Sequence, residues 1–335
     1  MRIAFTEMQN WEKPVLEERL AGHTLQFFDQ PLEESQLAEL AECEVLSIFI
    51  YSRITREILE KLPKLKLIAT RSTGFDHIDV AAAKERGIIV ANVPSYGENT
   101  VAEHAFALIL ALSRNVHRSH VRRLRNNFSI EGLKGFDLKG KTLGVVGAGK
   151  IGLHVIRIAR GFGMNVLAFD NYQNTFLSEV LHFQYVPFEQ LLAESDIISL
   201  HTPYTPATHH LINEKNIEQI KRGAILINTA RGELVDNDAL IHGLDAGILR
   251  GAGLDVIEGE HLIREEKELL ATNRDPQELQ ELVKDHILLG RDDVVYTPHI
   301  AFYSEEALHR ILETTVDNIT CFVDGSCQNI VPGGH

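Results

Sequence analysis

Three glycines near the middle of the chain constrain its fold more than any other feature. They follow the spacing G-x-G-x-x-G and are Gly147, Gly149 and Gly152. An apolar run precedes them, a segment with helical periodicity follows them, and a second apolar run comes after that; these segments are residues 143–146, 153–162 and 165–169. The order predicts a strand, a tight turn, a helix and a second strand, which is the arrangement of a dinucleotide-binding unit.

Each position of this unit has a physical role in holding a dinucleotide. The first glycine allows a tight turn, the second lets the backbone approach a pyrophosphate, and the third lets the helix pack on the strand. The start of the helix offers free N–H groups to the phosphates. Asp170 ends the second strand and can accept hydrogen bonds from ribose hydroxyls, whereas it would repel a 2′-phosphate. Because no arginine stands at 171–174, we expect NAD(H) rather than NADP(H).

The composition argues against several classes of protein. The formal net charge is −14 over 335 residues, so the chain lacks the basic surface that nucleic acid requires. Its three cysteines, Cys43, Cys321 and Cys327, have neither a disulfide pattern nor metal-ligand spacing, and we expect a cytoplasmic location and no metal. No apolar stretch is long enough for a membrane span. His209 and His210 are adjacent, and we expect them in a solvated loop.

Apolar runs alternate with amphipathic segments along the whole chain. In the first part the runs are 3–5, 25–28, 45–50, 67–69 and 88–90, and helical segments are expected at 34–41 and 56–62. A single helix is expected over 100–123, before the glycine unit. Beyond that unit the apolar runs are 197–200, 224–227, 251–254 and 294–296, and an amphipathic helix is expected over 305–323. This alternation predicts an α/β fold with parallel sheets.

Three residues with chemically useful side chains each follow an expected strand in the second half, where ligands of parallel sheets bind. They are Arg231, Glu260 and His299. A guanidinium can bind a carboxylate in a bidentate manner, and histidine transfers protons near neutral pH. Together they suit a 2-hydroxyacid dehydrogenase, in which Arg231 holds an α-keto acid and His299 gives a proton to its carbonyl oxygen as hydride arrives. Glu260 would support His299.

The chain is similar to the D-isomer-specific 2-hydroxyacid dehydrogenase family over nearly its whole length. The matching stretches are RSTGFDHIDVAAAKERGI, NVPSYGENTVAEHAFALIL, GVVGAGKIG, INTARGELVD, GLDVIEGE and TPHIAF. The resemblance implies that the three residues above are the catalytic ones. It implies two Rossmann-like, doubly wound domains: a split, flavodoxin-like substrate domain at 1–98 and 299–335, and an NAD-binding domain at 99–298. Members of the family are usually homodimers joined through the NAD-binding domains.

The resemblance also implies which residues contact NAD(H). They lie in the glycine turn and in the loops that follow the strands: Val101, Gly147, Gly149, Lys150, Ile151, Gly152, Asp170, Thr202, Pro203, Thr229, Ala230, Arg231 and Asp255. Among these, Thr202 and Pro203 would flank the adenosine and Val101 would pack on the nicotinamide ring. Thr229, Ala230 and Asp255 would hold the nicotinamide amide.

Within the family, the chain most resembles the D-lactate dehydrogenase branch. The stretches YSRIT, PSYGEN and HIAFY place aromatic side chains near the substrate: Tyr51, Tyr96, Phe302 and Tyr303. An aromatic lining suits a small apolar group such as the methyl of pyruvate. Thr73 and Gly74 would offer backbone N–H groups to the substrate carboxylate, together with Arg231. The stretch from Glu260 to His299 is longer than in the glycerate and phosphoglycerate branches, as in the lactate enzymes. We expect a charged surface helix in its insert at 262–293.

Two alternatives stay open at this point. The chain could be a glyoxylate/hydroxypyruvate reductase or a phosphoglycerate dehydrogenase-like enzyme of the same family, although no obvious pair of basic residues for a phosphate stands near His77. It could instead be an NAD(H)-sensing regulatory protein that uses the fold only for binding. Turnover of a simple keto acid would separate the second alternative from the enzymes. The sequence does not distinguish which keto acid is used or in which direction the reaction runs.

Overall fold

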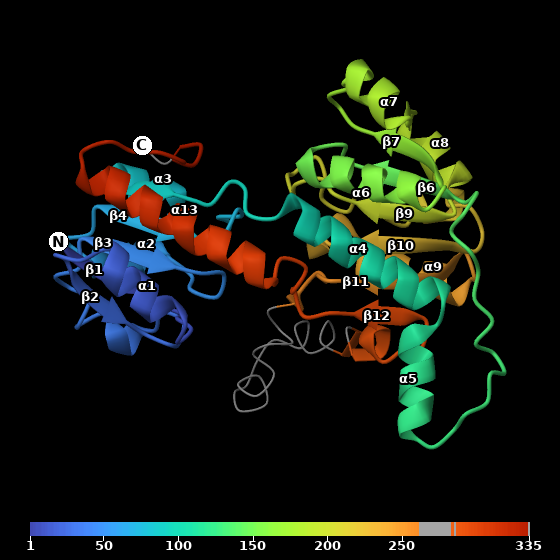
Figure 1. Cartoon of the computed structure of the whole chain (residues 1–335), viewed down its shortest axis with the longest axis horizontal. Coiled ribbons are helices and arrows are strands. Elements are labelled where there is room, and N and C mark those ends of the chain that lie inside the picture. The colour runs from blue at the N-terminus through green and yellow to red at the C-terminus, as the bar shows by residue number, and fades with distance from the viewer. Residues whose placement is uncertain (261–282, 285, 334–335) are drawn as a thin grey trace. The chain divides into compact units, whose positions relative to one another are not determined.

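The computed structural model describes residues 1–260, 283–284 and 286–333. The chain divides into two compact units (Figure 1). Unit 1 comprises Met1–Gly97 and Ser304–His335, and unit 2 comprises Glu98–Tyr303. Most of the segment 262–293, where a surface helix was expected, lies outside the described residues. No helix in the described ranges combines the length and apolarity needed to cross a membrane.

The sheet of unit 1 has five parallel strands in the order β2-β1-β3-β4-β5, which is the flavodoxin-like order. The strands are β1 (Arg2–Phe5), β2 (Thr24–Phe27), β3 (Val45–Ile48), β4 (Leu67–Thr70) and β5 (Ile89–Ala91). Helices α1 (Glu12–Arg19) and α13 (Glu305–Val323) pack on one face of the sheet. Helices α2 (Arg56–Glu60) and α3 (Val80–Glu85) pack on the other. The C-terminal helix thus completes the core that the first strands begin.

The sheet of unit 2 has seven parallel strands in the order β12-β11-β10-β9-β6-β7-β8. The strands are β6 (Thr142–Val146), β7 (Asn165–Phe169), β8 (Gln184–Tyr185), β9 (Ile197–Leu200), β10 (Ala224–Asn228), β11 (Leu249–Leu254) and β12 (Val294–Tyr296). The strand order reverses between β6 and β9. At such a switch point the loops diverge and leave a crevice for a ligand.

Helices cover both faces of this second sheet. Helices α4 (Glu98–Ser113) and α6 (Lys150–Gly161) share a core with β6 and β7 on one face. Helices α8 (Phe188–Glu194) and α9 (Asn237–Asp245) contribute to the core on the other. The structure also has helices α5 (Val116–Leu124) and α7 (Thr175–Leu181), and the 3-10 turns η1 (Glu34–Gln36), η2 (Ile217–Gln219) and η3 (Gly232–Leu234). In Figure 1, α4 and α6 run side by side across the sheet.

Two expected helices differ in the structure. The single helix expected over 100–123 is broken between α4 and α5, because Asn115 adopts a left-handed conformation with φ 53°. Its amide Nδ2 donates to Leu133 O at 3.3 Å, which holds the break in place. The helix expected over 34–41 is only the turn η1, where Glu33 and Gln36 form a capping box. Periodicity alone does not reveal side-chain hydrogen bonds that compete with a continuous helix.

The unit boundaries also differ from those expected, by one residue at the first and five at the second. The loop 299–303, which was assigned to the split domain, belongs to unit 2. Hydrogen bonds connect the backbone of this loop to unit 2, because His299 N donates to Asp255 O at 2.8 Å. Ile300 N and Ala301 N donate to the Asp255 carboxylate at 2.9 and 2.8 Å. Consequently all three expected catalytic residues lie in one unit.

Candidate active site

The glycine turn after β6 has the geometry that its spacing predicts. Gly147 has φ 95°, and a Cβ at this position would lie 2.7 Å from the carbonyl carbon of His201. A Cβ on Gly152 would lie 2.0 Å from Gly147 O. Any side chain at either position would therefore push the turn away from β9 or from α6.

The middle glycine differs from the other two because a Cβ on Gly149 would meet nothing within 4 Å. This residue is the N-cap of α6, and it provides no side chain to cap the helix. The carboxylate of Asp170 accepts Ala148 N and Tyr172 N, both at 2.8 Å, and so holds the turn to the end of β7. Open space at a helix start next to an ordered acid fits the pyrophosphate and ribose of NAD.

The remaining cofactor candidates lie around this turn and after β9 and β10. Lys150 begins α6, with its Nζ 3.5 Å from Glu98 Oε1, and Ile151 is the second residue of that helix. Thr202 and Pro203 lie in the half-exposed loop after β9, and Val101 is buried on α4. Thr229 is 8% exposed, and its Oγ1 has no hydrogen-bond partner in the described ranges. A buried hydroxyl in this state fits a polar ligand group such as the nicotinamide amide.

The loop after β10 is shaped by Asn228, which the sequence did not single out. Asn228 is buried, its Nδ2 donates to Arg231 O at 2.8 Å, and its Oδ1 accepts Ala230 N at 3.1 Å. These bonds close a tight loop that presents Arg231, whose Nη1 donates to Ala230 O at 2.7 Å. A Cβ on Gly232 would lie 2.1 Å from the carbonyl carbon of Ile257. The Arg231 loop therefore packs directly against the segment that leads to Glu260.

Two of the expected catalytic side chains form a pair. His299 Nδ1 and Glu260 Oε1 are 3.1 Å apart, and both side chains are about one quarter exposed. Since Glu260 holds Nδ1, the other ring nitrogen, Nε2, is the one left for a substrate. His299 has φ 53°, a conformation that costs energy for residues other than glycine and is found at functional sites. Arg231, Glu260 and His299 follow β10, β11 and β12, which are neighbours in the sheet.

Asp255 anchors the loop that carries His299. It is fully buried. Burial alone would raise the pKa of its carboxyl, but hydrogen bonds hold that pKa below the ordinary value. The donors are His104 Nε2, Thr297 Oγ1, Ile300 N and Ala301 N. The family resemblance implies that Asp255 holds the nicotinamide amide, and in the structure its carboxylate anchors the loop that carries His299.

His104 and Thr297 are further site residues that the sequence analysis missed. His104 Nε2 and Thr297 Oγ1 are 2.9 Å apart, and both reach Asp255. The available signal was a histidine three residues after Val101, directly before the apolar run 105–112 of α4. A polar side chain at such a position needs a buried partner.

The aromatic residues beyond His299 have unequal positions. Phe302 is 8% exposed, and its ring packs edge-on against the His299 imidazole with 6.4 Å between centroids. Tyr303 is 51% exposed and packs against Phe302. Phe302 therefore orients the histidine ring, and of the two aromatics only Tyr303 presents a large exposed surface.

The expected substrate residues in unit 1 lie in loops after its strands. Tyr51 is 46% exposed, and its backbone N–H donates to Glu7 at 3.0 Å. Thr73 Oγ1 donates to Val93 O at 2.7 Å, while the N–H groups of Thr73 and Gly74 have no acceptor in the described part of the chain. Two adjacent N–H groups of this kind can bind an anion. Tyr96 is half-buried, and its carbonyl accepts a hydrogen bond from Arg310.

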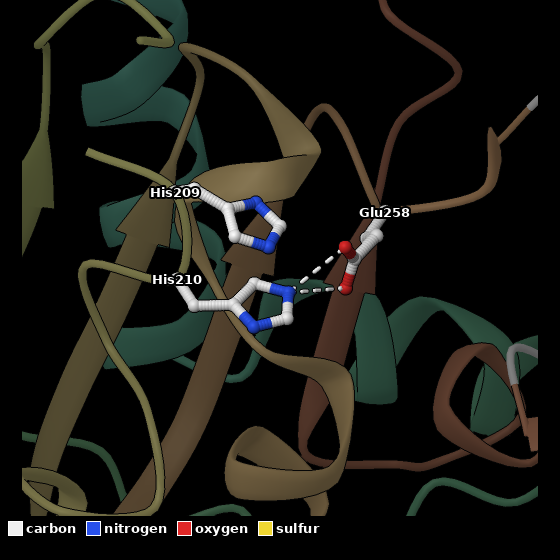
Figure 2. A group of neighbouring side chains, drawn as sticks. All are labelled: His209, His210 and Glu258. Carbon is white, nitrogen blue, oxygen red and sulfur yellow. Dashed lines mark hydrogen bonds and ion pairs between the residues drawn. The ribbon is translucent and has the colours of Figure 1, made fainter. Parts of the chain in front are cut away.

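His209 and His210 lie in the turns that follow β9, in the loop where they were expected. His209 is exposed. His210 is half-buried, and its Nε2 lies 2.8 Å from Glu258 Oε1, a hydrogen bond that is shown in Figure 2. The sequence could not predict this contact, because residues 210 and 258 are brought together only by the sheet.

Comparison with known proteins shows the family of the chain. A family model described as "D-isomer specific 2-hydroxyacid dehydrogenase, NAD binding domain" matches residues 106–301. A 2-hydroxyacid dehydrogenase homolog of Haemophilus influenzae is 40% identical over 99% of each chain. The D-lactate dehydrogenase of Escherichia coli is 39% identical over 98% of this chain and 99% of its own length.

A solved structure gives the same result for the fold. The D-lactate dehydrogenase of Aquifex aeolicus, complexed with NAD and lactic acid, has a TM-score of 0.87 and 40% identity over 98% of each chain. The expected fold class of two parallel-sheet α/β domains and the expected NAD cofactor are thus confirmed. The chain belongs to the D-isomer-specific 2-hydroxyacid dehydrogenase family, whose members are NAD-dependent oxidoreductases.

Proposed function

We propose that this chain is a D-lactate dehydrogenase that interconverts pyruvate and D-lactate. The observation that carries the proposal is the pair formed by Glu260, which follows β11, and His299, which follows β12. The same unit contains the glycine turn at the start of α6, whose geometry suits a dinucleotide. Relatives named D-lactate dehydrogenase span almost the whole chain. The aromatic side chains at Phe302 and Tyr303 suit a substrate with a small apolar group.

In this proposal each side chain has one task. The Arg231 guanidinium binds the substrate carboxylate in a bidentate manner. His299 holds a proton on Nε2 and gives it to the carbonyl oxygen of the keto acid, or takes it back from the hydroxyl in the reverse direction. Glu260 holds Nδ1 and so orients the ring. NAD, when bound, supplies or accepts the hydride. The backbone N–H groups of Thr73 and Gly74 and the aromatic residues Tyr51 and Tyr96 are proposed substrate contacts of unit 1, whose role is substrate binding.

The test is a substrate panel at equal concentration with NADH: pyruvate, 2-ketobutyrate, phenylpyruvate, glyoxylate, hydroxypyruvate and oxaloacetate. We expect the highest kcat/KM for pyruvate and a product of D configuration in a chiral assay. A preference for glyoxylate or hydroxypyruvate would move the chain to another branch of the family. NADH binding without any turnover would instead favour a regulatory binding protein.

We also propose that the chain forms a homodimer through unit 2 and that it works in the cytoplasm. The dimer is supported by apolar side chains that α5 and the following loop leave at least 40% exposed: Val116, Val121, Leu124, Phe128 and Ile130. Patches of this kind usually mark an interface. The proposed cytoplasmic location is supported separately, because the three cysteines are free thiols. Light scattering should give the mass of a dimer, and Phe128→Glu with Ile130→Glu should give a monomer; a monomeric wild type would contradict the dimer.

A further inference from the structure

A cluster of two imidazoles and one carboxylate lies in unit 2 and has no part in the function proposed above. It consists of His209, His210 and Glu258 (Figure 2). One ligand atom of each residue lies within 4.8 Å of the other two. His209 is exposed, and the other two residues are half-buried. We propose that this cluster binds a divalent transition-metal ion of the zinc type.

The distances between His210 and Glu258 are close to those of two ligands on one ion. His210 Nε2 lies 2.8 and 3.0 Å from the two carboxylate oxygens of Glu258. Bonds from zinc to nitrogen or oxygen are about 2.0–2.2 Å, so two ligands of a tetrahedral ion lie roughly 3.3–3.6 Å apart. The pair therefore needs to open by only a few tenths of an ångström to admit the ion.

His209 supplies the third ligand from the same side. Its ring stacks on that of His210, with 3.9 Å between centroids and 21° between planes. In Figure 2 both rings turn a nitrogen-bearing edge toward the Glu258 carboxylate. Because the His209 side chain is exposed, it has room to adjust toward an ion held by the other two residues.

A second carboxylate stands behind His210. Asp236 Oδ2 lies 3.9 Å from His210 Nδ1, the ring nitrogen that faces away from Glu258. Asp236 is itself held in place, because its carboxylate caps α9 by accepting Asp238 N and Ala239 N at 2.9 and 3.4 Å. Histidines that bind metals usually donate the other ring nitrogen to a carboxylate, which orients the ring and increases its basicity. At 3.9 Å Asp236 is beyond hydrogen-bond distance, and it would form this bond if the ring moved toward it by a few tenths of an ångström.

The backbones of two ligands are held by the fold. His210 N donates to Glu233 O at 2.8 Å, and Asn213 Nδ2 donates to His210 O at 2.7 Å. Glu258 O accepts Asn237 Nδ2 at 3.2 Å. A metal site needs this kind of support, since ligands that are already placed lose little freedom on binding.

The ligand types select the ion. Two imidazoles and one carboxylate favour zinc, cobalt, nickel or copper, whereas magnesium and calcium prefer oxygen ligands throughout. Three protein ligands leave a position for water. An ion here would connect the loop after β9 to the segment after β11 and so stabilise unit 2 against unfolding.

The experiment uses the full-length chain without a histidine tag. Calorimetry with zinc sulfate and the visible absorption of bound cobalt measure affinity and coordination, and thermal unfolding measures stabilisation. We expect one equivalent to bind to the wild type and to raise its Tm. We expect His209→Gln and Glu258→Gln to weaken binding by at least about tenfold. Asp236→Asn keeps the helix cap and should weaken binding by roughly the same factor.

A matched control is available on α9. His242 Nε2 lies 2.9 Å from Glu218 Oε1, and this exposed pair belongs to no three-residue cluster of such side chains in the described part of the chain. His242→Gln should leave zinc affinity unchanged. The proposal is overturned if the wild type takes up no ion at roughly millimolar zinc. It is also overturned if His209→Gln binds zinc as tightly as the wild type. Neither readout depends on turnover, so failure here leaves the proposed function untouched.

Discussion

Gly232 is packed against the backbone of a neighbouring segment, and replacing this residue by alanine should separate two parts of the catalytic apparatus. The added Cβ would lie 2.1 Å from the carbonyl carbon of Ile257, 2.2 Å from its oxygen and 2.4 Å from Glu258 N. All three are backbone atoms, so no side chain can rotate away. Ordinary contact begins at 3.4 Å, so the two segments must move apart by about 1.3 Å.

The consequence is large because one segment carries Arg231 and the other leads to Glu260. A misplacement of about 1 Å in a catalytic arrangement can cost roughly 100-fold in rate, which corresponds to about 2.7 kcal/mol of activation free energy. Forcing an extra methyl group into a packed region also costs about 1–3 kcal/mol of folding stability. We therefore expect Gly232→Ala to lower kcat/KM by about 100-fold and to lower Tm by several degrees.

The assay is the initial rate of NADH oxidation with the best keto acid, accompanied by thermal unfolding and by NADH binding measured from fluorescence. Gly161→Ala is the control, because a Cβ there, at the end of α6, would meet nothing within 4 Å. It should keep full activity and gain up to about 1 kcal/mol of stability. A Gly232→Ala enzyme with kcat/KM within about threefold of the wild type and an unchanged Tm would refute the argument.

Further expectations concern single side chains. Arg231→Lys loses the planar fork and should raise KM for the keto acid by roughly tenfold or more; an unchanged KM would exclude the carboxylate contact. Asp170→Asn should lower the preference for NADH over NADPH by about tenfold, and an unaltered ratio of kcat/KM values would remove Asp170 from the ribose site. Asp255→Asn leaves buried donors without an acceptor and should cost about 1–3 kcal/mol of unfolding free energy. The pKa of Asp255 is held below its ordinary value in the folded protein. The carboxylate therefore makes its full contribution to the free energy of unfolding above about pH 4 and loses it as the pH falls. Chemical denaturation as a function of pH should therefore show a shallower acid dependence for Asp255→Asn than for the wild type, and equal dependence would contradict this.

The elements that the sequence predicted well are those set by local pattern. The strand at 165–169 and the helix at 305–323 have the expected bounds, since short apolar runs between turns and amphipathic periodicity are strong local signals. The glycine turn was predictable because each glycine there has a steric reason that spacing alone encodes. The break at Asn115 was not, because it depends on a partner that lies eighteen residues further along the chain.

The supporting residues of the site were harder to find than the reacting ones. Arg231, Glu260 and His299 follow strands and have side chains that suit the chemistry, so position and type identify them together. Asn228 and His104 act through buried hydrogen bonds within the site. The Asn228 bonds are local turn contacts with the residues two and three further along the chain. The His104 contact with Thr297 forms only after the strands take their places in the sheet, and no sequence spacing reports it.

The central claim is that His299, held by Glu260, moves the proton in this enzyme, and the kinetics of His299→Asn test it most directly. Asparagine tolerates the left-handed backbone of this position, where φ is 53°, but it cannot act as an acid or base near neutral pH. We predict that kcat falls by about 10²–10⁴-fold while the NADH dissociation constant stays the same. A variant that keeps nearly normal kcat would contradict the account.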